Sequence, residues 1–88
     1  MLRIIELQNL DRKDIPLSYR RTFTANARAE GANSGSFTQS IEFDIEKTAM
    51  GTTEISVRIV GSCQYPLVPL KRELRTHISQ LESGGALP

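Results

Sequence analysis

The stretch IEFDIEKTAMGTTEISVRIV, residues 41–60, decides the fold because apolar and polar residues alternate on both sides of its middle. Such alternation is typical of a β-strand that buries one face. If Ile45 pairs with Ile55, both apolar rows fall on one side of a two-stranded hairpin whose loop is Ala49-Met50-Gly51. A three-residue hairpin loop favours Gly at its third position, where the backbone takes a positive φ. We therefore predict that Gly51 is a structural turn residue.

The polar row of this hairpin is rich in carboxylates. The same register sets three acids opposite an arginine, a serine and a glutamate: Glu42–Arg58, Asp44–Ser56 and Glu46–Glu54. Side chains two residues apart on a strand project from one face roughly 6.5–7 Å apart, a spacing that could serve a metal ion or an acid–base pair. Every strand with alternate acids has that spacing, and charge is the default on an open sheet face. We interpret the row as a solvated surface.

The first predicted strand, residues 2–7 (LRIIEL), has apolar side chains at both parities. This pattern predicts a strand whose two faces are both covered, or one whose second face meets a partner. Residues 11–16 (DRKDIP) follow as a predicted turn, since Pro16 fixes its own φ and favours extended geometry in the residue before it.

A second β-prone segment spans residues 18–26 (SYRRTFTAN). Arg21 shares the parity of the apolar Phe23, so we expect either a bulge that re-aims it or an edge strand where its head group reaches water. The next segment, residues 29–36 (AEGANSGS), is predicted to be a mobile loop because small and polar residues dominate it.

The period changes to that of a helix in residues 61–85. Five aliphatic residues fall on one helical stripe: Leu67, Leu70, Leu74, Ile78 and Leu81. Pro69 suits the first turn of a helix, although YPLVPLK (65–71) also has the spacing of a Pro-rich ligand for an SH3-type groove. Gly84 or Gly85 is predicted to end the helix, and residues 84–88 are expected to fray.

These elements predict an α+β fold: an antiparallel sheet of three to four strands with one C-terminal amphipathic helix packed on one face. The chain of 88 residues is expected to form a single small domain, residues 1–88, because one core of this size leaves no room for a deep cleft between lobes.

The composition excludes several classes of protein. The net charge is +1, which excludes a supercharged binder of nucleic acid, and no apolar run approaches the roughly 18 residues that span a bilayer. A secreted domain of this size held by disulfides would carry an even set of cysteines, whereas this chain has only Cys63. We expect a cytoplasmic protein that does not bind a membrane.

No sequence motif for catalysis, a cofactor or a metal is present. Cys63 and His77 could form an activated thiolate if they met, but nothing in the sequence brings them within hydrogen-bond reach. A buried cysteine and a half-exposed helix histidine are the simpler interpretation. We expect a protein without enzymatic activity, cofactor or metal.

Two functions are compatible with these observations. The first is a non-catalytic accessory or protein-interaction module that acts as a homo-oligomer, because the first strand has apolar residues on both faces and the core is small. The alternative is a small nucleic-acid-binding domain that uses Arg20, Arg21 and Arg28 on the Arg-rich strand at 18–28. The near-neutral charge and the lack of an aromatic-rich strand disfavour nucleic acid, so we expect self-association or a protein partner.

Overall fold

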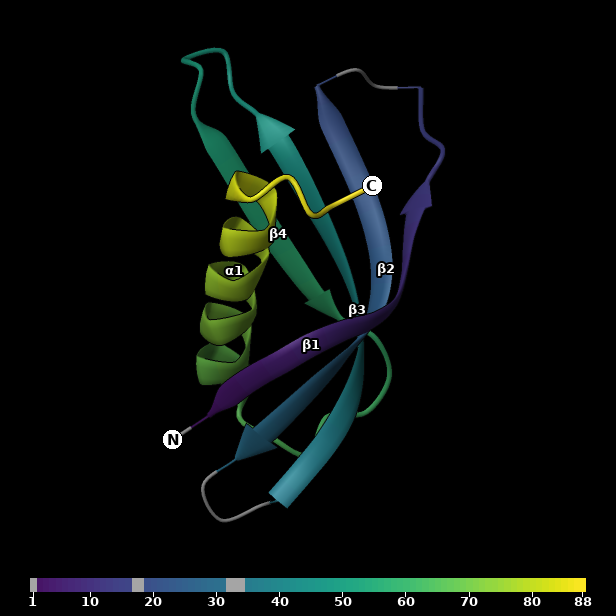
Figure 1. Cartoon of the computed structure of the whole chain (residues 1–88), viewed down its shortest axis with the longest axis vertical. Coiled ribbons are helices and arrows are strands. Elements are labelled where there is room, and N and C mark those ends of the chain that lie inside the picture. Colours follow the sequence, from purple (N-terminus) through teal and green to yellow (C-terminus); the bar gives the residue numbers. More distant parts are fainter. Residues whose placement is uncertain (1, 17–18, 32–34) are drawn as a thin grey trace.

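The structure is a computed structural model that describes residues 2–16, 19–31 and 35–88. Its elements follow in chain order as four strands and a helix: β1 (Arg3–Lys13), β2 (Arg20–Gly31), β3 (Gly35–Lys47), β4 (Thr53–Ile59) and α1 (Leu67–Ser83). The strands form one antiparallel sheet in the order β1-β2-β3-β4, so each strand pairs with its neighbour in the sequence (Figure 1). The predicted α+β fold is confirmed, with four strands.

The β3–β4 hairpin has the predicted register, with Ile45 opposite Ile55. The Thr48 N–H donates to the Thr52 carbonyl (2.9 Å), and the Gly51 N–H donates to the Thr48 carbonyl (3.0 Å), which closes the three-residue loop. Gly51 has a φ of 82°, so the prediction of a left-handed residue at the third loop position is also confirmed.

The middle of the sheet is held by an aromatic pair. Phe23 of β2 lies opposite Phe43 of β3, and the two rings stack with centroids 5.0 Å apart. Phe43 in turn lies opposite Val57 of β4, so one row of apolar side chains crosses three strands. All three side chains are buried, which places this row at the centre of the core.

Two irregularities in β1 change which of its side chains face the core. Ile4 pairs with Ala29 and Leu7 with Ala27, so β1 uses one more residue than β2 over the same distance. A second register shift includes Asn9, whose φ is 53°. Asn tolerates this region better than most residues. Each extra residue reverses the alternation of a strand.

Consequently, β1 does not have two equivalent apolar faces. Leu7 and Leu10 pack against the same core cluster as Ile4, although Leu7 differs from Ile4 in spacing by three residues rather than two. The prediction of a strand covered on both faces is therefore wrong, because single-residue bulges turned the second apolar set inward. The predicted turn at 11–16 is also wrong in its first half, since residues 11–13 still belong to β1.

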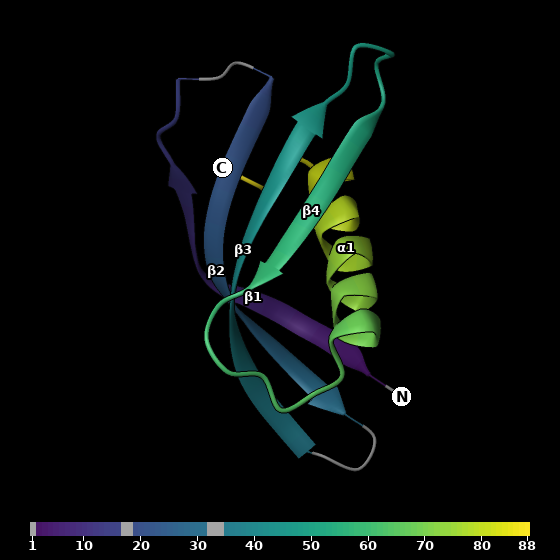
Figure 2. The ribbon, with the colours of Figure 1, turned by 180° about the vertical axis from the view of Figure 1, so that it is seen from behind.

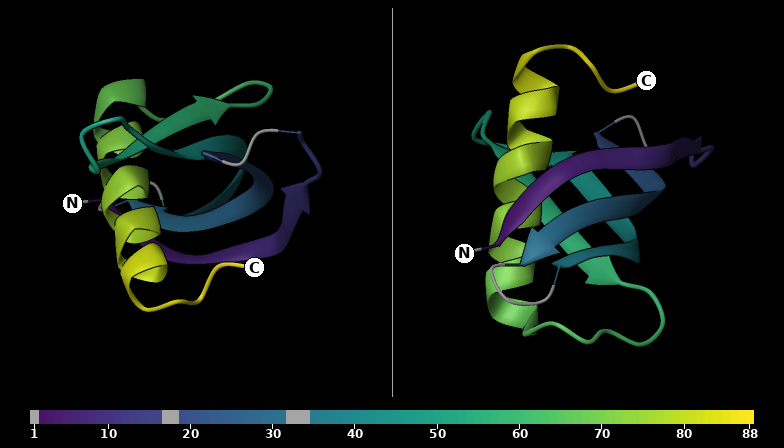
Figure 3. Two further views of the ribbon diagram at one scale, coloured as in Figure 1. Left: turned by 90° about the horizontal axis from the view of Figure 1, so that it is seen from above. Right: turned by 60° about the horizontal axis from the view of Figure 1, so that its bottom comes forward.

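The sheet curls around one side of α1 (Figure 3). The helix contacts both outer strands, β1 and β4, and lies on the open side of the curve. Leu70, Leu74 and Ile78 form its fully buried face. Leu67 was expected on that stripe but is 49% exposed, because it lies in the first turn beyond the part of the sheet that the helix covers.

The concave face of β2 carries small side chains. Ala25, Ala27 and Ala29 are all buried, and Ala27 and Ala29 lie opposite Leu7 and Ile4 of β1. Small residues on the inside of a curved sheet leave volume for larger neighbours, which is what close packing of a core requires. The helix therefore fits inside a curve whose central lining is alanine.

The boundaries of the predicted segments differ in places from the structure. Residues 29–31 end β2 and residues 35–36 begin β3, so the loop predicted at 29–36 is too long at both ends. Residues 32–34 of that loop, and residue 18 of the β-prone segment, lie outside the described residues. At the other terminus, Gly85 has a φ of 68° and its N–H donates to the Glu82 carbonyl. Gly85 is thus the residue that ends the helix.

The tail beyond the helix makes contact with the domain. Residues 84–88 were expected to fray, yet Leu87 is half-buried and packs against the core cluster. No helix in the described ranges is long and apolar enough to cross a membrane.

We predict that Gly51→Val lowers the free energy of unfolding by about 1 kcal/mol or more, because a β-branched residue resists positive φ. A Cβ added at Gly51 meets no atom within 4 Å, so the cost comes from the backbone conformation and not from a clash. Chemical denaturation measures the change. Ala49→Val in the same loop is the matched control, and an equal loss in both variants would contradict the prediction.

Candidate functional site

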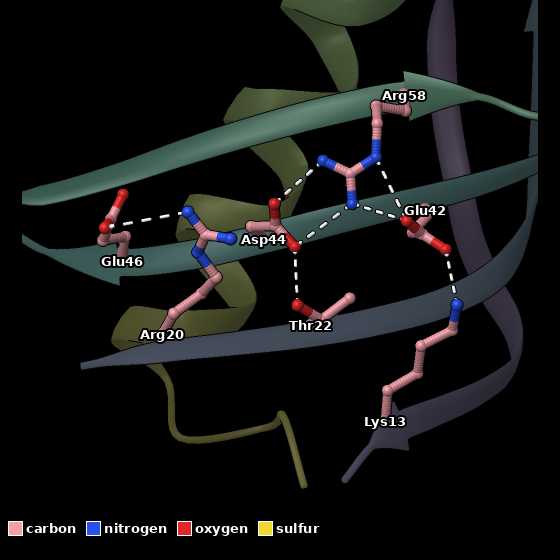
Figure 4. Close-up of polar contacts among 7 residues, drawn as sticks. All are labelled: Lys13, Arg20, Thr22, Glu42, Asp44, Glu46 and Arg58. Carbon is pink, nitrogen blue, oxygen red and sulfur yellow. Dashed lines mark hydrogen bonds and ion pairs between the residues drawn. The ribbon is translucent and has the colours of Figure 1, made fainter. Parts of the chain in front are cut away.

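The convex face of the sheet carries a cluster of charges centred on Arg58 of β4 (Figure 4). Its guanidinium donates to Glu42 Oε1 through Nε (3.1 Å) and Nη2 (2.6 Å). It also donates to Asp44 Oδ2 through Nη1 (2.8 Å). The predicted Glu42–Arg58 pair is therefore present, and the same arginine reaches diagonally to the next carboxylate along β3.

Two further residues complete this cluster. Lys13 at the end of β1 donates through Nζ to Glu42 Oε2 (2.7 Å), and Thr22 of β2 donates through Oγ1 to Asp44 Oδ1 (2.7 Å). Thr22 is buried and only 14% of the Asp44 side chain is exposed. The row is thus more than the solvated surface that we inferred, because the carboxylates are partly removed from water and fully engaged.

The contacts explain how these groups titrate. Hydrogen bonds from Lys13 and then Arg58 lower the pKa of Glu42. The hydrogen bonds from Arg58 lower the pKa of Asp44, although burial opposes them and Thr22 adds to them. The two carboxylates in turn raise the pKa of Arg58. A carboxylate held in its charged form accepts hydrogen bonds but is a poor proton donor near neutral pH, so the geometry fits a structural ion-pair cluster.

The third acid of the row is arranged differently. Glu46 lies opposite Glu54, as expected, and its carboxylate is 4.0 Å from Arg20 Nη2. Among the described residues, no three His, Cys, Asp or Glu side chains are grouped closely enough to hold a metal ion.

The three arginines proposed for nucleic acid do not share one surface. Arg20 lies on the convex face beside Glu46, whereas Arg21 lies on the concave face and forms an ion pair with Glu82 at the end of α1. Arg28 is exposed near the other end of β2. Neighbouring residues on a strand point to opposite faces, so the sequence cluster at 20–21 is divided by the sheet.

The Arg21–Glu82 pair resolves the position of Arg21 in an apolar row. β2 pairs with β3 without a register shift and lies inside the sheet, so neither a bulge nor an edge strand accounts for it. The side chain instead sits beyond the apolar core, where the end of α1 supplies a carboxylate. Both side chains are partly buried, with 29% and 27% exposed.

Cys63 and His77 are engaged separately. The Cys63 thiol donates to the Tyr65 carbonyl (3.2 Å), and no hydrogen bond joins it to His77 in the part of the chain that the structure describes. Burial lowers the pKa of His77. The geometry supports the simpler interpretation of two unconnected side chains.

A cavity of about 370 Å³ opens where the segment between β4 and α1 passes the start of β3. Figure 2 shows this segment looping from the end of β4 to the start of the helix. Six uncharged residues line the cavity: Phe37, Thr38, Gln39, Ser62, Gln64 and Tyr65. The sequence held no signal for this cavity, since the two halves of its wall are far apart in the chain.

The fold and these sites define a small α+β domain whose most ordered polar feature is an ion-pair cluster on the convex face of its sheet. The chain belongs to a protein family whose shared sequence pattern matches residues 1–83, and so includes all four strands and the helix. No curated protein and no solved structure matches the chain significantly.

We predict that the cluster around Arg58 makes the protein less stable in acid. The ordinary pKa values of Glu42 and Asp44 are 4.5 and 3.8, and both are lowered in the folded state. The unfolded chain therefore binds more protons near pH 4, and the stabilisation is complete above that range and lost as the pH falls through the lower, folded-state values. Urea denaturation between pH 6 and pH 3 measures the loss.

The Arg58→Gln variant tests this assignment. Its free energy of unfolding should fall less steeply with acid than that of the wild type, by about 1 kcal/mol over the range, because its carboxylates lose their strongest donor. Arg72→Gln on the exposed side of α1 is the matched control. His77 is present in all three proteins and so cancels, and parallel curves for wild type and Arg58→Gln would contradict the prediction.

We predict that Arg21→Gln lowers the free energy of unfolding by about 0.5–1 kcal/mol, because it leaves the partly buried Glu82 without its partner. Arg28→Gln, an exposed arginine on the same strand, should change it by less than about 0.5 kcal/mol. Both values come from chemical denaturation at neutral pH. Equal effects at the two positions would mean that the Arg21–Glu82 pair does not join the helix to the sheet.

Proposed function

We propose that this domain is a non-catalytic accessory or protein-interaction module that acts as a homo-oligomer. The observation that carries the proposal is apolar surface that the fold does not use. Val60, Leu67 and Val68 flank the segment between β4 and α1, and they are 49%, 49% and 68% exposed. Exposed aliphatic side chains are common singly, but two adjacent ones on a helix whose core face is already complete favour a contact with another protein.

The helix does not need Leu67 or Val68 for its own packing. Its buried face consists of Leu70, Leu74 and Ile78, each with no exposed surface. A polar residue at either exposed position would serve the helix equally well. Burying both side chains against a partner would contribute about 1.5–3 kcal/mol per side chain. The first turn of α1 is therefore the surface that best supports association.

A second copy of the chain is the partner that we propose. Under two-fold symmetry the same patch lies on both subunits, and an apolar patch is complementary to itself. An 88-residue domain also has a small margin of stability, which association increases. The apolar first strand no longer supports this proposal, because its bulges turn Leu7 into the core of the same chain.

Light scattering over a range of micromolar concentrations tests the proposal. We expect the wild type at twice the monomer mass of 9.8 kDa, and Leu67→Ser/Val68→Ser at the monomer mass with an unchanged circular dichroism spectrum. Met50→Ser is the control, since Met50 is 90% exposed at the tip of the hairpin. A wild-type mass of 9.8 kDa that persists as the concentration rises would rule out the homo-oligomer.

A further inference from the structure

The cavity beside β3 has the size and lining of a small-ligand site. Its volume of about 370 Å³ lies within the range of roughly 300–1,000 Å³ typical of such pockets. One wall comes from β3 and the other from the segment that follows β4, so the tertiary fold assembles it.

The apolar part of the lining is flat. Phe37 and Tyr65 stack with ring centroids 5.6 Å apart and an angle of 18° between their planes. Both residues are half-buried and line the cavity, so they keep accessible surface while holding each other in place. Aromatic rings fixed in this way favour a planar ligand that lies against them.

Gln39 supplies a hydrogen-bond acceptor of fixed orientation. It is 6% exposed, and its Nε2 donates to the Val60 carbonyl (3.0 Å) and the Ser40 carbonyl (3.1 Å). Both amide hydrogens are thereby used, and Oε1 accepts no hydrogen bond from the described residues. That oxygen is not among the buried atoms without a partner, so it reaches accessible space, and the cavity is the space that Gln39 lines.

No charged side chain lines the cavity, which disfavours an ionic group inside it. The remaining polar groups are the hydroxyls of Thr38 and Ser62 and the amide of Gln64, all on exposed residues around the opening. They can donate or accept and so would adapt to a ligand held by the aromatic wall and Gln39.

We propose that this cavity binds an uncharged planar nitrogen heterocycle whose N–H group donates to Gln39 Oε1 while its ring lies against Phe37 and Tyr65. A nucleobase has this chemistry. It could arrive as a free nucleoside or as an unstacked base of a single-stranded nucleic acid. The site goes beyond the proposed function and is independent of it, because its lining includes neither Leu67 nor Val68.

Titration of the ¹⁵N-labelled full chain with adenosine, guanosine, cytidine and uridine tests the proposal by NMR. We expect at least one nucleoside to shift the amide signals of Phe37, Gln39 and Tyr65, with a dissociation constant on the order of 0.1–1 mM. For adenosine, the matched ligand is N6,N6-dimethyladenosine, which keeps the ring and lacks the exocyclic N–H. Shifts elsewhere only, or none with any nucleoside at about 10 mM, would overturn the proposal.

Tyr65→Leu should weaken binding at least about tenfold, because it removes the flat ring and keeps an apolar side chain. Tyr19→Leu is the matched control, since Tyr19 is the other tyrosine of the chain and lies outside the cavity lining. If Tyr65→Leu fails to fold, Gln64→Ala at the exposed opening gives a milder test, with a loss of about threefold. Equal binding by wild type, Tyr65→Leu and Gln64→Ala would overturn the site.

A single-stranded octanucleotide distinguishes the two sources of the ligand. Binding more than tenfold tighter than the nucleoside, and weaker in high salt, would identify a base within a nucleic acid. Equal affinity for nucleoside and octanucleotide would identify the free ligand. The mass of the protein, measured on the same samples, reports separately on the homo-oligomer.

Discussion

The register in which Phe23 faces Phe43 and Phe43 faces Val57 is the constraint on which the rest of the structure depends. A slip of one residue would turn these side chains out of the core and bring the polar row inward. The same register places Arg58 within reach of both Glu42 and Asp44 on the opposite face. The apolar row therefore determines the position of the charged cluster, which adds local support but could not form without it.

The segment between β4 and α1 connects the two surfaces for which we propose roles. Its ends carry the exposed side chains of Val60, Leu67 and Val68, and its middle supplies Ser62, Gln64 and Tyr65 to the cavity. The segment is held by the thiol–carbonyl bond within it and by the Gln39 amide, which binds the Val60 carbonyl. It is thus an ordered loop on a rigid sheet, an arrangement in which binding groups are commonly found.

The sequence by itself determined the elements whose causes are local. Alternation at period two and the left-handed preference of Gly51 were sufficient for the β3–β4 hairpin and its register, and the helical stripe was sufficient for α1 and most of its buried face. The Glu42–Arg58 pair followed from that register. The diagonal contact from Arg58 to Asp44 was also within reach of the same reasoning, because residues two apart on a strand lie close enough for an arginine.

Only the tertiary structure decided the features that join segments distant in the chain. The bulges in β1 turn Leu7 inward because a core takes the apolar side chains that neighbouring strands leave room for, and alanines on β2 provide that room. Arg21 remains in an apolar row because α1, formed some sixty residues later, brings Glu82 to it. Leu67 is exposed because the helix extends past the sheet, and the cavity exists because Tyr65 returns to Phe37. Each outcome depends on three-dimensional proximity, which the local patterns of the chain do not encode.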